Sequence, residues 1–121
     1  MEEVILKIIN FLYSFLKVKR EIEYKKRLQV AKEFVEKLED LSDLSLKYEI
    51  SGSTNRKDFC FHSDIDIDII CRNDIDVQKV YKFTHYLIMV FVKKYNYFID
   101  CYITSEEFIQ RFTKIIAIKR S

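Results

Sequence analysis

The sequence contains no proline and only one glycine, Gly52, in 121 residues. The residues that usually mark turns and linkers are therefore scarce, and element boundaries have to be predicted from the spacing of apolar residues. No internal repeat, low-complexity tract or linker is visible, so we expect one domain over 1–121. A composition of 49% hydrophobic and 33% charged residues is typical of a folded chain.

Several classes of protein are excluded by what the sequence has little of. A formal net charge of +2 is too small for a dedicated nucleic-acid binder, which carries a concentrated basic excess. Three cysteines without a CxxC pair argue against a disulfide framework. The apolar run at 4–18 is too short and too charged for a membrane span. The opening Met-Glu-Glu lacks the basic segment of a signal peptide. We therefore expect a cytoplasmic protein.

The first 44 residues are predicted to be a helical segment. In 3–18 the polar residues fall on one stripe, and nearly all other positions are apolar. Residues 20–42 instead have the amphipathic pattern of a helix with one buried face. No helix breaker separates the two parts, so the sequence leaves open whether they form one helix or two.

A helix that is apolar around most of its circumference has to be covered on most sides. This predicts a homodimer, or an obligate complex with a partner protein, with residues 3–18 at the contact. The alternative is that this helix folds back across an open sheet of the same chain.

Residues 46–120 are predicted to form the core of an α+β domain with a small mixed sheet. Alternating apolar residues at 46–50 indicate a strand that ends at Ser51-Gly52, and a loop follows. Residues 64–71 and 97–103 are the second and third expected strands.

Two helices are expected to accompany this sheet. An amphipathic pattern over 76–95 predicts a helix that Asp74 or Asp76 would cap. Residues Thr104 and Glu107 form a possible capping box for a last helix that ends near residue 119.

Asp64, Asp66 and Asp68 alternate with isoleucines in the second strand. Because successive side chains of a strand point to opposite faces, the carboxylates share one face while the isoleucines enter the core. Neighbouring carboxylates on that face begin about 6.6 Å apart, and their tips can converge on Mg²⁺ or Mn²⁺. Without a cation they repel, which raises a carboxyl pKa. A solvated acidic strand face is the alternative interpretation.

Gly52 and Ser53 stand at the end of the first strand. A glycine there lets the backbone approach a ligand closely, and the serine supplies a hydroxyl and an N–H for phosphate oxygens. A plain turn is the alternative. Nine residues separate Ser53 from Ser63, which immediately precedes the aspartates.

This arrangement resembles the minimal nucleotidyltransferases of the DNA polymerase β superfamily. Their signature is a hydrophobic strand, Gly-Ser, a spacer of similar length and Asp-x-Asp, and the resemblance covers roughly 46–119. It implies a third carboxylate on a later strand, and Asp100 in YFIDCYI has the expected order and surroundings. Arg56 matches a basic residue common in the family's loop. Lys57 and Asp68 depart from the family, where glycine and an aliphatic residue are frequent.

The resemblance implies a metal-dependent enzyme that transfers a nucleoside monophosphate, expected to be AMP from ATP, to a hydroxyl acceptor. By resemblance, Asp64, Asp66 and Asp100 would be catalytic and would hold two Mg²⁺ or Mn²⁺ ions, with Asp100 also helping to withdraw the acceptor's proton. The residues implied in nucleotide binding are Gly52, Ser53, Arg56 and Ser63.

The acceptor is the part of the function that the sequence leaves open. Larger relatives add a helical domain that grips the acceptor, which implies that a partner completes the site here. Small members of the family often pair with helical proteins of the HEPN class as toxin and antitoxin, and the transferase adenylylates its partner. The alternatives are non-catalytic masking of a partner and transfer to a small molecule, and a nucleic-acid acceptor is not excluded.

Overall fold

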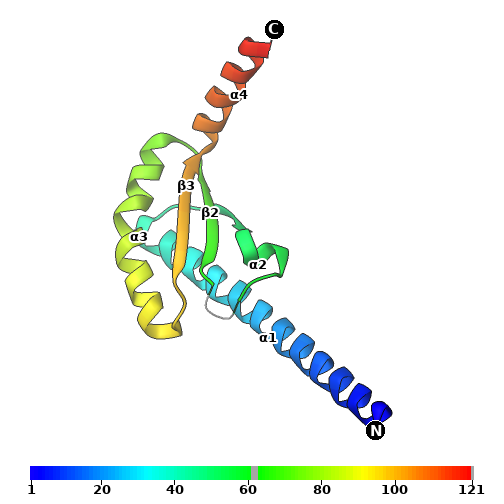
Figure 1. Ribbon diagram of the computed structural model, residues 1–121. Coiled ribbons are helices and arrows are strands. Elements are labelled where there is room, and N and C mark those ends of the chain that lie inside the picture. Colours follow the sequence, from blue (N-terminus) through cyan, green and yellow to red (C-terminus); the bar gives the residue numbers. More distant parts are fainter. Residues whose placement is uncertain (61–62, 121) are drawn as a thin grey trace.

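The computed structural model describes residues 1–60 and 63–120, so residues 61–62 of the expected loop lie outside it. The elements are α1 (Glu2–Ser42), β1 (Lys47–Ser51), α2 (Gly52–Arg56), β2 (Ile65–Cys71), α3 (Asp74–Tyr95), β3 (Ile99–Ser105) and α4 (Glu106–Arg120) (Figure 1). This architecture confirms the predicted α+β class with a small mixed sheet.

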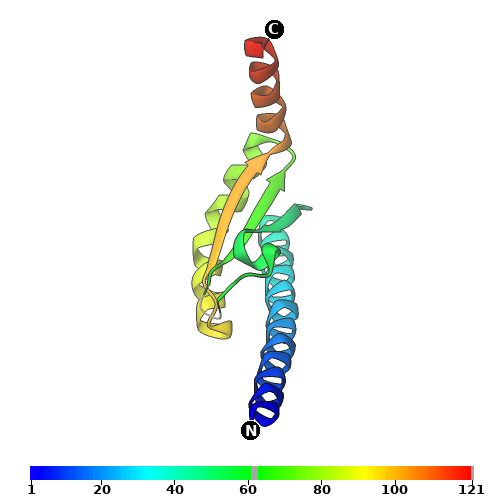
Figure 2. The ribbon, with the colours of Figure 1, turned by 45° about the vertical axis from the view of Figure 1, so that its right-hand side comes forward.

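The helical segment at the start of the chain forms one continuous helix, α1, rather than two. Its C-terminal half packs on the sheet, whereas residues 1–22 are exposed and extend away from the folded body (Figures 1 and 2). The alternative interpretation, in which the apolar helix folds back across the sheet of the same chain, is therefore wrong. The apolar N-terminal half stays uncovered within the described chain.

The sheet has the strand order β1-β2-β3. β1 and β2 are antiparallel neighbours, so the short connection through α2 is enough to join them. β2 and β3 are parallel, and α3 supplies the long connection that parallel neighbours require. This topology puts the Gly-Ser step and the Asp-x-Asp stretch at the same end of the sheet.

The core lies between one face of the sheet and the helices α1 and α3. The isoleucines at 65, 67 and 69 are fully buried there, as the alternation in the sequence predicts. Phe34 of α1 meets Phe91 of α3 edge to face, with ring centroids 5.3 Å apart. Burying side chains of this size stabilises the fold by about 1.5–3 kcal/mol each.

The caps of the last two long helices differ from the predicted ones. Asn73, rather than Asp74 or Asp76, caps α3, and its side chain accepts a hydrogen bond of 2.9 Å from the N–H of Asp76. The third strand is shifted by two residues and extends to Ser105. The Ser105 hydroxyl therefore caps α4 by accepting from the N–H of Phe108, in place of the Thr104–Glu107 box.

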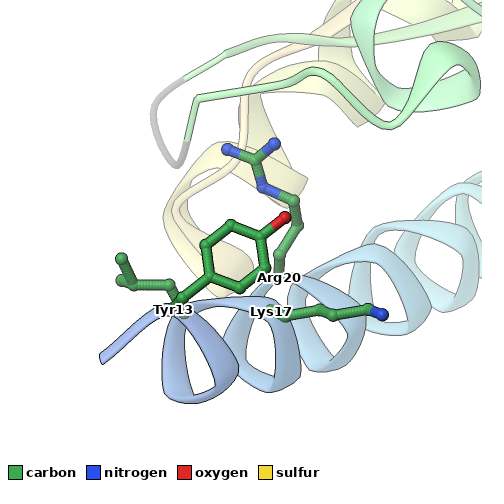
Figure 3. A pocket seen from close by; sticks show the side chains of 4 residues that line it. Tyr13, Lys17 and Arg20 are labelled. Carbon is green, nitrogen blue, oxygen red and sulfur yellow. The ribbon is translucent and has the colours of Figure 1, made fainter. Parts of the chain in front are cut away.

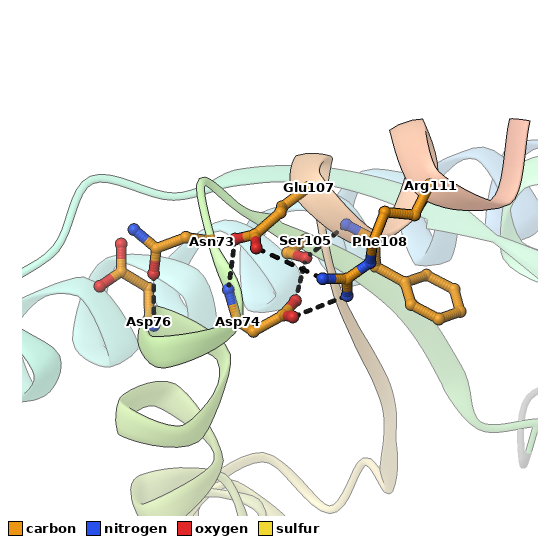
Figure 4. Close-up of polar contacts among 7 residues, drawn as sticks. All are labelled: Asn73, Asp74, Asp76, Ser105, Glu107, Phe108 and Arg111. Carbon is orange, nitrogen blue, oxygen red and sulfur yellow. Dashed lines mark hydrogen bonds and ion pairs between the residues drawn. The ribbon is translucent and has the colours of Figure 1, made fainter. Parts of the chain in front are cut away.

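Asp74, which was expected to cap α3, instead forms hydrogen bonds that link the start of α3 to α4 (Figure 4). Its carboxylate accepts hydrogen bonds from the Ser105 hydroxyl at 2.6 Å and from the Arg111 guanidinium at 2.7 Å. Glu107 accepts from the backbone N–H of Asp74 and also pairs with Arg111. These polar contacts fix the start of α4, which otherwise projects from the body at the end opposite to residues 1–22 (Figure 1).

Because the chain has a single glycine, other residues occupy the left-handed positions that follow its helices. Asp43 and Asn96 follow α1 and α3 in the left-handed conformation that usually favours glycine, with φ of 55° and 59°. Lys57 does the same after α2, with φ 62°. The backbone at this position therefore adopts a left-handed, glycine-like conformation even though a lysine occupies it. The helix α2 itself was expected to be loop.

No helix within the described residues is both long enough and apolar enough to cross a membrane.

We predict that Asp74→Asn loosens α4 without unfolding the sheet, because Arg111 loses its charged acceptor. The hydroxyl of Ser105 and the guanidinium of Arg111 hold the pKa of Asp74 below its usual value. The contact is therefore present at neutral pH and is lost as the pH falls through that lowered pKa, below the usual range of an aspartate. Hydrogen exchange, corrected for intrinsic rates, should show faster exchange in α4 of the variant and unchanged protection in β2. Equal protection of α4 in both proteins would contradict this role.

Candidate active site

The predicted carboxylates gather on the sheet face opposite the isoleucine core. Asp66 and Asp68 alternate with buried residues along β2. Asp66 lies directly beside Asp100 of β3 in the parallel register, so the two side chains point to the same face. On β1, Glu49 lies directly opposite Asp68. We call Glu49, Asp66, Asp68 and Asp100 the acidic face.

Asp66 stands at the centre of this charge. Partial burial raises its pKa, and the carboxylates of Asp100, Asp64 and Asp68 raise it further, in that order. Arg56 acts in the opposite direction but is the smallest influence named. The arrangement therefore holds negative charge that the protein itself compensates only weakly.

Asp100 is oriented by a residue that the sequence analysis missed. The hydroxyl of Tyr102 donates a hydrogen bond of 3.0 Å to Asp100 Oδ2. This bond, followed by the negative charge of Asp100, raises the pKa of Tyr102. The two-residue alternation of β3 would have indicated that these side chains share a face. Glu49 was also missed. Its position opposite Asp68 depends on the register between β1 and β2, which the sequence does not show.

Gly52 is required by the carboxylate beside it. Its φ is +64°, a conformation that side chains disfavour, and a Cβ placed there would lie 2.9 Å from Asp66 Cγ and closer still to Asp66 Oδ2. The single glycine of the chain therefore lets the backbone at the start of α2 come against Asp66. Any larger residue at this position would displace the carboxylate or the turn.

The other residues of the Gly-Ser motif lie in α2. Ser53 and Arg56 belong to this short helix, next to the end of β1. The Arg56 guanidinium is exposed and pairs with Asp58 at 3.0 Å. The Lys57 ammonium lies over the ring of Tyr24, 4.8 Å from its centroid, and thus points towards α1.

Ser63 has a structural partner within the loop. Its hydroxyl accepts a hydrogen bond of 2.9 Å from the N–H of Cys60, and its own N–H donates to the Cys60 carbonyl. These contacts tie Ser63 to Cys60, so the hydroxyl of Ser63 already has a partner within the protein.

Arg27 holds this region together, and the sequence analysis assigned it no role. It is fully buried, and it donates hydrogen bonds to the Thr54 hydroxyl at 3.2 Å and the Cys60 carbonyl at 3.0 Å. Its guanidinium also lies against the rings of Phe59 and Tyr97. One side chain of α1 thereby holds both α2 and the loop that leads to Asp64.

The donor set of the acidic face suits a hard divalent cation. Carboxylate oxygens are the ligands that Mg²⁺ and Mn²⁺ prefer, and the raised pKa of Asp66 marks repulsion that a cation would relieve. Among residues 1–60 and 63–120, no three His, Cys, Asp or Glu side chains already converge closely enough to hold a metal. The carboxylates would therefore have to turn towards an ion as it binds.

The hollows in the described part of the chain include the following two. A groove of about 400 Å³ runs between α3 and β3 and reaches Asp100, with Tyr81, His85 and Phe98 along it. A second pocket, of about 320 Å³, is lined by Tyr13, Leu16, Lys17 and Arg20, where α1 leaves the body (Figure 3). Only the first contains a residue of the acidic face.

We predict that Arg27→Met lowers the free energy of unfolding by about 1–3 kcal/mol, because the buried Thr54 hydroxyl would lose its donor. Chemical denaturation would measure the change. Lys37→Met, at an exposed position of the same helix, is the matched control. A loss no larger than that of the control would show that Arg27 does not anchor the loop.

We also predict that Asp66→Asn stabilises the metal-free protein at neutral pH. The variant removes like-charge contacts that cost up to about 1 kcal/mol each, so Tm should rise by about 2–5 °C. The pKa of Asp66 is raised in the folded state, so its ionised form destabilises the fold, and this penalty disappears as the pH falls through that raised pKa. The gain should therefore shrink in acid. A lower Tm for the variant at neutral pH would contradict the electrostatic account.

Comparisons with protein-family models, with curated proteins and with solved structures gave no match to this chain. The functional interpretation therefore depends on the motif spacing and on the geometry of the acidic face.

Proposed function

We propose that the protein is a metal-dependent nucleotidyltransferase that transfers AMP from ATP to a hydroxyl acceptor. The observation that carries the proposal is the side-by-side position of Asp66 and Asp100 on parallel strands, with the Gly52 backbone against Asp66. Residues far apart in the sequence thus meet in the combination that the resemblance to minimal nucleotidyltransferases requires.

The carboxylates have distinct roles in this proposal. Asp64, Asp66 and Asp100 would hold two Mg²⁺ or Mn²⁺ ions. Such ions stabilise the charge that builds on the attacking and leaving oxygens of an in-line displacement at phosphorus. Asp66, whose carboxylate is the most crowded by like charge, would gain most from the neutralisation.

The transfer itself exchanges one bond to phosphorus for another. The acceptor hydroxyl oxygen forms a bond to the α-phosphorus of ATP while the bond from that phosphorus to the bridging oxygen breaks, and pyrophosphate leaves. Asp100 would accept the proton of the hydroxyl. The hydrogen bond from Tyr102 supports this role, because it orients the Asp100 carboxylate.

The triphosphate would bind at the start of α2. Gly52 and Ser53 offer backbone N–H groups and a hydroxyl there, and Arg56 offers a guanidinium whose present partner, Asp58, is exposed. Arg56 could exchange that surface ion pair for a phosphate at small cost. Ser63 would contribute through its control of the loop, since its hydroxyl bonds to Cys60.

The groove along β3 is the proposed location of the acceptor. It contains Asp100, the proposed proton acceptor, and it is lined by the aromatic residues Tyr81 and Phe98. A protein side chain with a hydroxyl could enter such an open groove. This favours a protein acceptor, such as a helical partner of the HEPN type in a toxin–antitoxin pair, over a small molecule that would need enclosure.

A non-catalytic interaction module is the second candidate. In that case the acidic face would only bind nucleotide or mask a partner. The crowding of Asp66 by three other carboxylates argues for the enzyme, because a binding surface alone has no need for acids that repel one another.

We further propose that the protein acts in the cytoplasm and associates through the N-terminal half of α1. Cys60, Cys71 and Cys101 are free thiols, which is typical of a reducing compartment. The exposed apolar residues of α1 support association with a second copy or with a helical partner protein.

We predict that Mg²⁺ with ATP raises the Tm of the wild-type protein, since a ligand that binds only the folded state stabilises it. At a ligand concentration about 100 times its Kd the gain is about 2.7 kcal/mol. Asp64→Asn/Asp66→Asn should abolish the response, because the ion would lose two of its carboxylate ligands. Differential scanning fluorimetry would measure both.

The matched control is Asp40→Asn/Asp43→Asn, which removes two exposed acids of α1 and its cap far from the acidic face. It should respond like the wild type. An equal response of the wild type and the Asp64/Asp66 variant would place the metal elsewhere. Stabilisation by ATP without release of pyrophosphate in the presence of any partner would favour the non-catalytic module.

A further inference from the structure

The N-terminal half of α1 carries an unbroken apolar stripe. The stripe follows alternating spacings of four and three residues, which is the heptad pattern of helices that pair. All of its side chains are more than half exposed. The members are Val4, Ile8, Phe11, Phe15, Val18 and Ile22.

The stripe changes character where α1 meets the folded body. Continued at the same spacing, it passes through Lys25, Gln29, Lys32 and Glu36, which are all exposed. The buried residues of that half, such as Ala31, Phe34 and Leu38, lie on the other side of the helix. The apolar stripe therefore faces away from the body, and it ends where the body begins to cover α1.

We propose that the stripe pairs with the same stripe of a second copy of this chain, and that the two α1 helices run antiparallel. This inference rests on the proposed association through α1 and not on the transferase chemistry. The N-terminal half of α1 projects from the body (Figures 1 and 2), and the side chains of its stripe are exposed.

The distribution of charge selects the antiparallel direction. Residues 1–9 carry Glu2, Glu3 and Lys7, a net side-chain charge of −1, whereas residues 17–26 carry five basic side chains against Glu21 and Glu23, a net charge of +3. An antiparallel pair places the net negative end of each helix beside the net positive end of the other. A parallel pair would instead place ends of like net charge together, and it would bring Lys25 of each copy together in line with the stripe.

The same direction gives a consistent register. Val4 meets Ile22 of the second copy, Ile8 meets Val18, and Phe11 meets Phe15, so six residues of each helix form continuous layers. On the flank of these layers, Lys7 of each copy comes beside Glu21 of the other. Within one chain Lys7 and Glu21 are 14 positions apart, about 21 Å along the helix, so they can meet only between copies.

The contact has the size of a specific interface. Twelve apolar side chains, at on the order of 100 Å² each, give roughly 1,200 Å². This is the lower end of the range of about 1,200–2,000 Å² that is typical of stable protein–protein interfaces. The pairing would also place the two folded bodies at opposite ends of the helix pair.

Sedimentation equilibrium of the full chain tests the pairing. The wild type should be a dimer, and Ile8→Glu/Phe15→Glu should be a monomer with unchanged helix content by circular dichroism. The matched control is Ile9→Glu/Leu16→Glu, which makes the same kind of change at exposed apolar residues outside the stripe and should stay dimeric. A monomeric wild type, or one that forms a complex only with a different protein, would overturn the proposal. Equal dissociation of both variants would overturn the assignment to this stripe.

Charge reversal tests the register. Lys7→Glu and Glu21→Lys should each raise the dimer dissociation constant by about tenfold, because two attractive pairs become repulsive in the symmetric dimer. Combining both changes in one chain should restore the wild-type value. Failure of the combined variant to recover would overturn the proposed register.

Cross-linking tests the direction. In a Cys60→Ser background, chains with Val4→Cys and chains with Ile22→Cys should form a mixed disulfide when combined, and neither should link to itself. Self-linking of each variant would show a parallel pair and overturn the proposal. Because these readouts need no nucleotide, their failure would leave the proposed transferase untouched, and a failed nucleotide response would leave the dimer untouched.

Discussion

The buried guanidinium of Arg27 is the contact on which the candidate site depends. It comes from the middle of α1 and bonds to Thr54 in α2 and to the carbonyl of Cys60 in the following loop. A planar group with several donors can satisfy two separate segments at once, and it also stacks on the aromatic rings of Phe59 and Tyr97. The Gly-Ser step and the Asp-x-Asp stretch are thus held to the same helix, which fixes where α2 sits relative to β2.

With α2 fixed in this way, the acidic face is held together despite its own repulsion. The backbone of Gly52 leaves room for the Asp66 carboxylate, and the sheet register brings Asp100 beside it. The fold therefore stabilises a group of like charges that would separate in a flexible chain, and the raised pKa of Asp66 is the electrostatic sign of that cost. Sites that bind cations commonly have this property, since the bound ion relieves the repulsion.

Much of the fold could be predicted from local patterns, because the alternation in β2 and the periodicity of the helices are determined by burial of one face. The candidate site could be predicted only in part. Arg27 was missed because a charged residue in an amphipathic helix is usually exposed. The cap of α3 was wrong because Asn73 and Asp74 are both good cap residues, and a distant partner, Arg111, decides between them. The close approach of Gly52 to Asp66 depends on strand pairing, which the sequence does not display.

The most direct test of this account is the pKa of the Asp66 carboxyl group, measured by nuclear magnetic resonance with and without Mg²⁺. The account predicts a value above that of an ordinary aspartate in the metal-free protein and a clear fall when Mg²⁺ is added. An ordinary pKa for Asp66, or a raised one that does not respond to Mg²⁺, would contradict the assignment of the acidic face as a metal site.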